Sequence, residues 1–138
     1  MPDLTAAFST VAIYVGLNIG ILCWITIATF GIRGAHKTWV GSGGVPQIER
    51  IHRGHANAVE QMPMMMLALF AMAAMGAPAF MVHLMGLTFT IGRALHASHF
   101  IAADAPGWTR RYGFMLSSVA FLSAGVGVVL HGLWDVLT

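Results

Sequence analysis

The sequence predicts an all-α integral membrane protein, a four-helix bundle whose helices all cross the bilayer. Hydrophobic residues make up 57% of the 138 residues and charged residues only 9%, against roughly 25% charged residues in soluble domains. That is too little charge to cover a soluble globule of this size, so lipid is the expected solvent. Four apolar stretches are each long enough to cross about 30 Å of hydrocarbon as a helix, at about 1.5 Å per residue.

The four stretches form one predicted domain over residues 1–138, with spans at about 6–32, 47–75, 79–102 and 110–137. The first has no Lys or Arg before it and is too long for the apolar core of a signal peptide, so we expect a membrane helix there. A glycine-rich loop leads to the second span. The short turn Gly76–Pro78 precedes the third span, and Ala103–Thr109 precedes the fourth.

The basic residues predict how the chain lies in the membrane. Apart from Arg93, every Lys and Arg flanks the first or the third connection: Arg33, Lys37, Arg50, Arg53, Arg110 and Arg111. The positive-inside rule places these two connections in the cytoplasm and both termini outside. So small a set of cations is not a nucleic-acid surface, and the single cysteine, Cys23, excludes an intrachain disulfide.

Polar residues recur on one face of the second predicted helix, and ionisable groups inside a span are costly enough to mark a site or a buried pair. The i, i+3, i+4 spacing puts them in one stripe: Arg50, Arg53, Asn57, Glu60 and Met64. On the third helix, Arg93 lies at a depth compatible with Glu60. We therefore expect an Arg93–Glu60 ion pair. His96 lies one turn further along the third helix.

Arginines from the first and fourth helices reach the same level as this stripe. Arg33, Arg110 and Arg111 complete an expected pocket that opens to the cytoplasm between apolar helices. Guanidinium groups bind carboxylates through two parallel hydrogen bonds and stay charged when partly buried. They also lower the pKa of a bound thiol and so increase its reactive thiolate fraction. The pattern predicts an anionic ligand beside a lipophilic one.

Simpler interpretations of these residues stay open. The flanking cations are also explained as orientation determinants that reach the headgroups, and Asn57 and Glu60 as bonds between neighbouring helices. Arg93 is also explained as purely structural. No metal site is predicted, because four histidines lack ligand spacing on a common face: His52, His55, His96 and His99. His83 and His131 are interpreted as interfacial or packing residues. The ten methionines are interpreted as adaptable packing or as a pliable lining for lipophilic substrates.

The second-span motif resembles that of a known family. The pattern Glu49-Arg50-x-x-Arg53-x-x-x-Asn57-x-x-Glu60-x-x-Pro63, entering an apolar helix in a four-span chain, is similar to the MAPEG family, the membrane-associated proteins of eicosanoid and glutathione metabolism. The resemblance covers essentially the whole chain and is closer to the bacterial branch. It implies a left-handed four-helix bundle in a bacterial inner membrane, assembled as a homotrimer, with glutathione between subunits near the cytoplasmic face.

The resemblance also implies roles for single residues. Arg53, Asn57 and Glu60 match residues that hold the glutathione peptide. His55 falls where a glutamine commonly contributes, and Arg93 matches an arginine near the same site. Three positions replace tyrosines of the synthase-like members and would change the hydroxyl contacts to glutathione: Gln61, His96 and Phe100.

Two further arginines are implied to be catalytic. Arg111, or alternatively Arg110, falls where an arginine stabilises the thiolate, and Arg33 matches one that assists the second substrate. The expected function is a glutathione transferase or peroxidase for detoxification, with glutathione as cosubstrate and lipophilic electrophiles or lipid hydroperoxides as substrates. Its partners would be membrane lipids and further copies of the chain. The alternative is a non-catalytic lipid- or glutathione-binding membrane protein of the same fold. A small transporter ranks last, because paired broken helices are absent.

Overall fold

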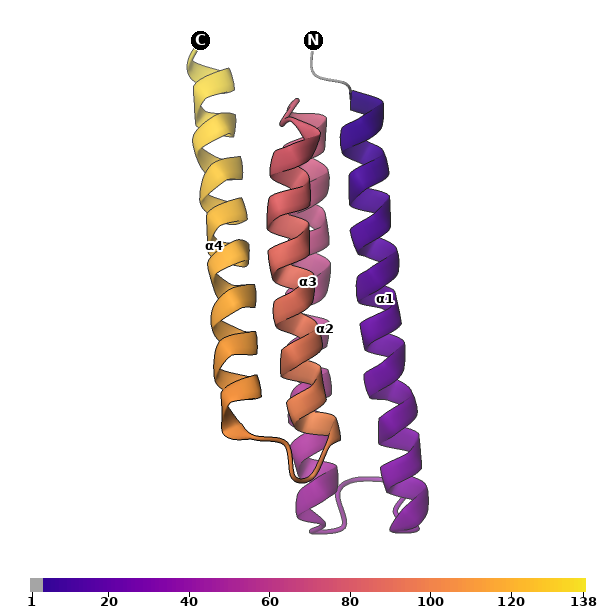
Figure 1. Ribbon diagram of the computed structural model, residues 1–138. Helices are drawn as coiled ribbons and strands as arrows, with labels where there is room; N and C mark the ends of the chain where they lie inside the picture. The colour runs from indigo at the N-terminus through magenta and orange to yellow at the C-terminus, as the bar shows by residue number, and fades with distance from the viewer. Residues whose placement is uncertain (1–3) are drawn as a thin grey trace.

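The computed structural model describes residues 4–138 and consists of four helices: α1 (Leu4–Ala35), α2 (Pro46–Ala74), α3 (Ala79–Ile101) and α4 (Gly107–Leu137). The helices alternate in direction (Figure 1). The start of α1, the end of α4 and the α2–α3 turn lie together at one end, here called the terminus end. The α1–α2 and α3–α4 connections lie at the other, here called the loop end. The predicted all-α fold with four helices is confirmed.

Local sequence explains where the helices begin and end. Helix α2 starts at Pro46, whose missing N–H would have had no partner in the first turn anyway. The acidic Glu49 in that turn interacts favourably with the helix dipole. The chain leaves α2 through Gly76, whose φ of +82° suits glycine. Pro78 and Pro106 then occupy the positions directly before α3 and α4.

The helices form an open arrangement rather than a closed bundle. Helices α2 and α3 pack against each other in the centre, α1 packs against both of them on one side, and α4 packs against both on the other (Figure 1). Within residues 4–138, α1 and α4 do not touch. A single chain therefore leaves one side of each outer helix uncovered.

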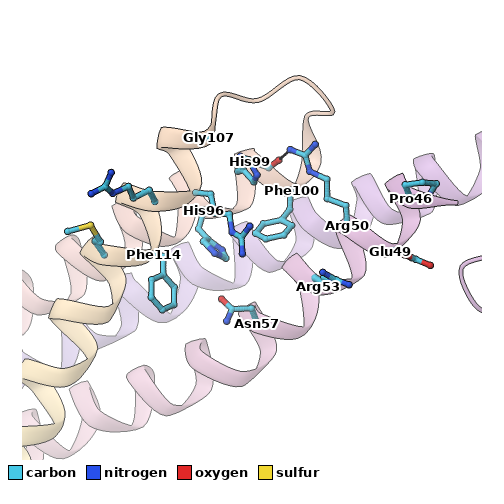
Figure 2. Close-up of a pocket in the computed structure, with 13 residues that line it drawn as sticks. Pro46, Glu49, Arg50, Arg53, Asn57, His96, His99, Phe100, Gly107 and Phe114 are labelled. Atoms are coloured by element: carbon cyan, nitrogen blue, oxygen red, sulfur yellow. Dashed lines mark hydrogen bonds between the residues drawn. The ribbon is translucent and has the colours of Figure 1, made fainter. Parts of the chain in front are cut away.

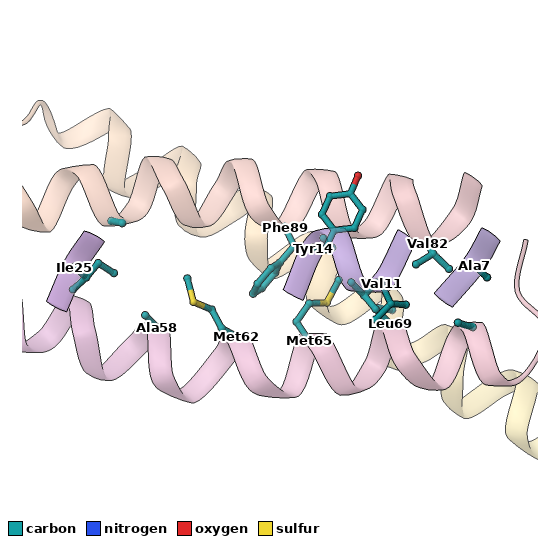
Figure 3. Packing of buried hydrophobic residues seen from close by; sticks show 14 of the residues in the cluster. Ala7, Val11, Tyr14, Ile25, Ala58, Met62, Met65, Leu69, Val82 and Phe89 are labelled. Carbon is teal, nitrogen blue, oxygen red and sulfur yellow. The ribbon is translucent and has the colours of Figure 1, made fainter. Parts of the chain in front are cut away.

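The apolar core follows the length of α2. Ile51, Met65 and Leu69 of α2 are fully buried. They and their neighbours along α2 meet side chains of α1 and α3, among them Ile25 and Phe89 (Figure 3). Methionines fill part of this contact, which suits a side chain that adapts to irregular gaps.

The closest helix contact joins α3 to α4 through glycines. A Cβ atom at Gly113 would lie 2.5 Å from the backbone nitrogen of His96, and one at Gly92 would lie 2.5 Å from the backbone nitrogen of Ser117. The two backbones therefore touch, as small residues allow between membrane helices. This contact fixes α4 against α3 nearly two turns from the start of α4.

The outer helices carry the largest apolar surfaces. Helices α1 and α4 are long and apolar enough to cross a membrane, and only 22% of the most apolar stretch of each is buried. A core helix of a soluble protein would be mostly buried, so these faces suit lipid or further subunits. Of the described helices, α2 and α3 do not meet the same length-and-composition criterion. That α2 and α3 also cross stays a prediction.

Candidate functional site

A large cavity opens at the loop end between α2, α3 and α4 (Figure 2). Its volume is about 970 Å³. Four arginines line it against a single carboxylate, and we call it the arginine cavity; its lining comprises Pro46, Glu49, Arg50, Arg53, Asn57, His96, His99, Phe100, Gly107, Arg110, Arg111, Phe114 and Met115. The excess of cations makes the cavity strongly attractive to an anion.

Two of the four arginines are held by the protein itself. Arg50 donates hydrogen bonds to the carbonyl oxygens of His99 and, at 2.8 Å, of Ala103. It thereby ties the α3–α4 connection to α2 at the mouth of the cavity. The guanidinium carbon of Arg110 lies 5.8 Å from the centre of the Phe100 ring, a cation–π contact.

The other two arginines are free to bind a ligand. Arg53 on α2 and Arg111 on α4 are exposed and line the cavity from opposite walls. Neither has a hydrogen-bond or ion-pair partner within residues 4–138. Their guanidinium donors are therefore available to an anionic group between the two helices.

A fifth arginine, Arg93, lies fully buried behind the cavity wall. Its Nη1 atom donates to Oδ1 of Asn57 at 2.8 Å and to Oε1 of Gln61 at 3.3 Å. Its Nε and Nη2 atoms have no hydrogen-bond partner. In the described chain no carboxylate pairs with it, although an unpaired buried charge is costly.

The predicted Arg93–Glu60 ion pair is wrong for this chain. Asn57 and Gln61 are four residues apart and share the face of α2 that meets α3. Glu60 is exposed and has no partner in the part of the chain that the structure describes. It points about 100° away from Gln61 around the helix. Similar depth along the two helices did not make the two charges face each other.

The bond from Arg93 determines what Asn57 presents to the cavity. Because its Oδ1 accepts from Arg93, the Nδ2 amide group, which has no partner within residues 4–138, remains available as a donor from a side chain that lines the cavity (Figure 2). Beside it, His96 is buried between the rings of Phe100 and Phe114, with centroid distances of 4.9 and 6.3 Å. The Nδ1 atom of His96 also lacks a partner. That nitrogen is buried, so the polar group that the inner wall offers to a ligand is the amide of Asn57.

Two predicted site residues lie elsewhere. Arg33 and His55 line a separate groove of about 430 Å³ between α1 and α2. There Arg33 Nη1 lies 2.7 Å from Nε2 of His52 and donates to the carbonyl of Gly41 at 3.0 Å. Nε2 of His55 lies 3.4 Å from the hydroxyl of Thr26. A single chain therefore does not bring Arg33 and His55 together with Arg111, and their roles stay predictions.

Several lining residues were not predicted as site residues, among them Phe114 and His99. Phe114 follows Arg111 by three residues, and His99 follows His96 by the same step. Helical spacing from the predicted residues would have found both. His99 Nδ1 lies 3.3 Å from the hydroxyl of Thr109, so it also helps to join the start of α4 to the end of α3.

Comparisons with known proteins agree with this architecture. The model of the MAPEG family matches residues 11–130. Over 85 residues the chain is 29% identical to the inner membrane protein YecN of Escherichia coli, covering 62% of this chain. The aligned part spans 65% of YecN, less than two thirds of its length. YecN from a second strain of Escherichia coli matches equally well.

Proposed function

The chain belongs to the MAPEG family and is a membrane protein, and we propose that it is a glutathione S-transferase acting on lipophilic electrophiles. The observation that carries the proposal is the pair of arginines, Arg53 and Arg111, which line the arginine cavity from α2 and α4 and have no partner within residues 4–138. A cavity of about 970 Å³ lies within the range of small-molecule sites. Glutathione has two carboxylates and a thiol, all of which gain from guanidinium donors.

In the proposed complex, the α2 and α3 residues hold the peptide. Arg53 binds a carboxylate at the mouth, and the amide group of Asn57 donates to the peptide deeper in the cavity. Arg93 contributes its positive potential from behind Asn57, where it already bonds the side-chain oxygen. Glutathione would thus complete the hydrogen bonding of an inner wall that the protein leaves unsatisfied.

Arg111 is the proposed catalytic residue. Its guanidinium stabilises the glutathione thiolate, so more of the thiol is in the reactive form at neutral pH. The sulfur then forms a bond to an electrophilic carbon, and the leaving group departs with its bonding electron pair. A lipid hydroperoxide in place of the electrophile would make the same site a peroxidase.

The proposed assembly is a homotrimer with its loop end in the cytoplasm of a bacterial inner membrane. The uncovered faces of α1 and α4 support a multi-chain assembly. So does Glu60, an exposed carboxylate in an apolar stretch of α2 without a partner in its own chain, since such a charge is costly in lipid. Neighbouring chains would supply that partner and bring Arg33 towards the arginine cavity. The lipophilic substrate would enter from the bilayer between chains.

A non-catalytic binding protein is the second candidate. One observation favours it: the α3 wall of the arginine cavity is formed by His96, His99 and Phe100 and offers no hydroxyl group. Such a site would hold glutathione or a lipid without activating a thiol.

The experiment is conjugation of a chloronitrobenzene by the purified protein in detergent, with and without glutathione. We expect glutathione-dependent turnover that Arg111→Ala abolishes and that Lys37→Ala retains, since Lys37 is a loop-end cation outside the cavity lining. Thermal stabilisation by glutathione without turnover would favour the binding protein. The absence of both turnover and stabilisation by glutathione would exclude the transferase and a glutathione-binding protein, and would leave only a lipid-binding protein.

A further inference from the structure

A second cavity, at the terminus end, is lined by four methionines among small and apolar residues. It has a volume of about 330 Å³ and lies where α2 turns into α3, against the last turns of α4. Four of the ten methionines of the chain line it: Met72, Met75, Met81 and Met85. We call it the methionine cavity. None of its lining residues is Lys, Arg, Asp or Glu, and the only titratable one is His131.

Helix spacing and the tight turn bring the thioethers together. Met72 and Met75 are three residues apart at the end of α2, and Met81 and Met85 are four apart at the start of α3, so each pair lies on one face of its helix. The turn through Gly76 sets the two pairs side by side. Met75 also reaches α4, because its Cε lies 3.7 Å from the position of a Cβ on Gly132.

The hydrogen bond of His131 prepares its ring as a ligand. Its Nε2 lies 3.1 Å from the carbonyl oxygen of Met75 and 3.8 Å from Oδ2 of Asp135. Both of those groups only accept a hydrogen bond or attract a proton, so the neutral ring carries its hydrogen on Nε2. Nδ1 then keeps a lone pair, and it has no partner in the described chain. Histidines that bind metals commonly donate their other ring N–H to a carbonyl or carboxylate in this way.

We propose that the methionine cavity binds a monovalent soft metal ion, Cu(I), through methionine thioethers and Nδ1 of His131. Thioethers and imidazole favour Cu(I), whereas Mg²⁺ and Ca²⁺ require oxygen ligands. The donors are all neutral, so the site carries only the single charge of the ion. The cavity lies at the opposite end from the arginine cavity, and this inference is independent of the proposed glutathione chemistry.

The test uses Ag(I), a soft monovalent ion with the ligand preference of Cu(I) and no redox reaction under the assay conditions. The full chain is purified in detergent as Cys23→Ser, because the exposed thiol of Cys23 would itself bind Ag(I). We expect one Ag(I) per chain by equilibrium dialysis, with shifts in the NMR methyl signals of the four lining methionines and not of the other six.

A matched pair of variants separates thioether ligation from apolar binding. Met75→Leu with Met81→Leu conserves volume but removes two sulfur donors, and it should weaken Ag(I) binding at least tenfold. The control, Met64→Leu with Met66→Leu, alters methionines outside this cavity and should leave binding unchanged. His131→Phe should weaken binding as well.

Three results would overturn the proposal. They are no saturable Ag(I) binding, binding that the Met75/Met81 variant leaves intact, and equal losses in that variant and the control. A cavity that takes an apolar fluorescent probe but no Ag(I) would instead be a site for lipophilic molecules, and the metal proposal would fail.

Discussion

Arg93 donates a 2.8 Å hydrogen bond to Oδ1 of Asn57, and that bond orients the Asn57 amide. Arg93 is fully buried. Water therefore does not reach its guanidinium, which depends on the side-chain oxygens of Asn57 and Gln61 as hydrogen-bond acceptors. Because the bond uses the oxygen of Asn57, its side chain offers the arginine cavity a donor rather than an acceptor. An anionic ligand requires donors there.

We expect Asn57→Asp to lower glutathione affinity by tenfold or more. The new carboxylate would pair with Arg93, remove both amide donors and place negative charge at the wall, where it repels a ligand carboxylate. Titration calorimetry measures the loss. Gln61→Glu is the matched control, because it gives Arg93 the same carboxylate from a residue outside the cavity lining. Equal losses in the two variants would show that the charge of Arg93, and not the Asn57 amide, controls binding.

We expect Arg50→Ala to loosen the α3–α4 connection. Arg50 bonds the carbonyls of His99 and Ala103, and hydrogen bonds from a charged donor contribute about 1.5–3 kcal/mol each. Amide hydrogen exchange in residues 102–105 should therefore accelerate about tenfold or more. Arg53→Ala is the control: with no protein partner, it should weaken glutathione binding and leave exchange unchanged. Unchanged exchange in Arg50→Ala would show that the hydrogen bonds of Arg50 do not hold the α3–α4 connection.

We expect Gly113→Ala to destabilise the protein by about 1–3 kcal/mol, because the added Cβ meets backbone of α3 that cannot move aside. Unfolding in detergent, followed by circular dichroism, measures the change. On the same helix, a Cβ at Gly125 meets nothing within 4 Å. Gly125→Ala should therefore be neutral or stabilising by up to about 1 kcal/mol. Similar behaviour of the two variants would refute the close α3–α4 contact.

We expect Glu60→Ala to weaken the proposed trimer and leave the fold of the chain intact. Glu60 has no partner within residues 4–138, so its proposed partner belongs to another chain. Native mass spectrometry should record more monomer in increasing detergent. Glu49→Ala is the control, since Glu49 accepts a bond from Ser42 of its own chain at 3.2 Å. A trimer unaffected by Glu60→Ala would place the contact elsewhere.

Hydropathy and spacing predicted the helices well, because the number and approximate extent of apolar stretches are local properties of a sequence. They also placed Arg53, Asn57, His96 and Arg111 at one level, and the structure brings these four to one cavity. The depth of a residue in the membrane does not determine which way its side chain points around the helix axis. Glu60 therefore turned out to face away from Arg93, and Arg33 lies on the other side of α2.

Hydropathy and helical spacing could not predict how α4 packs on α3. It depends on glycine contacts between segments far apart in sequence, and nothing in the local pattern pairs Gly92 with Gly113. The methionine cavity was missed for a related reason, since its donors lie on three helices and only the turn through Gly76 brings them together.

The glycine contact between α3 and α4 fixes one point of α4 and leaves its first residues less constrained. From Gly113 to its start at Gly107, α4 extends about 9 Å beyond the contact. Arg110 and Arg111 lie in this segment. A tilt of residues 107–113 about the contact would widen the mouth of the arginine cavity and would hardly change its inner wall. The width of the entrance and the shape of the binding wall are thus separately adjustable, so substitutions in the α3–α4 connection would alter which molecules enter and leave the polar contacts of Asn57 and His96 in place.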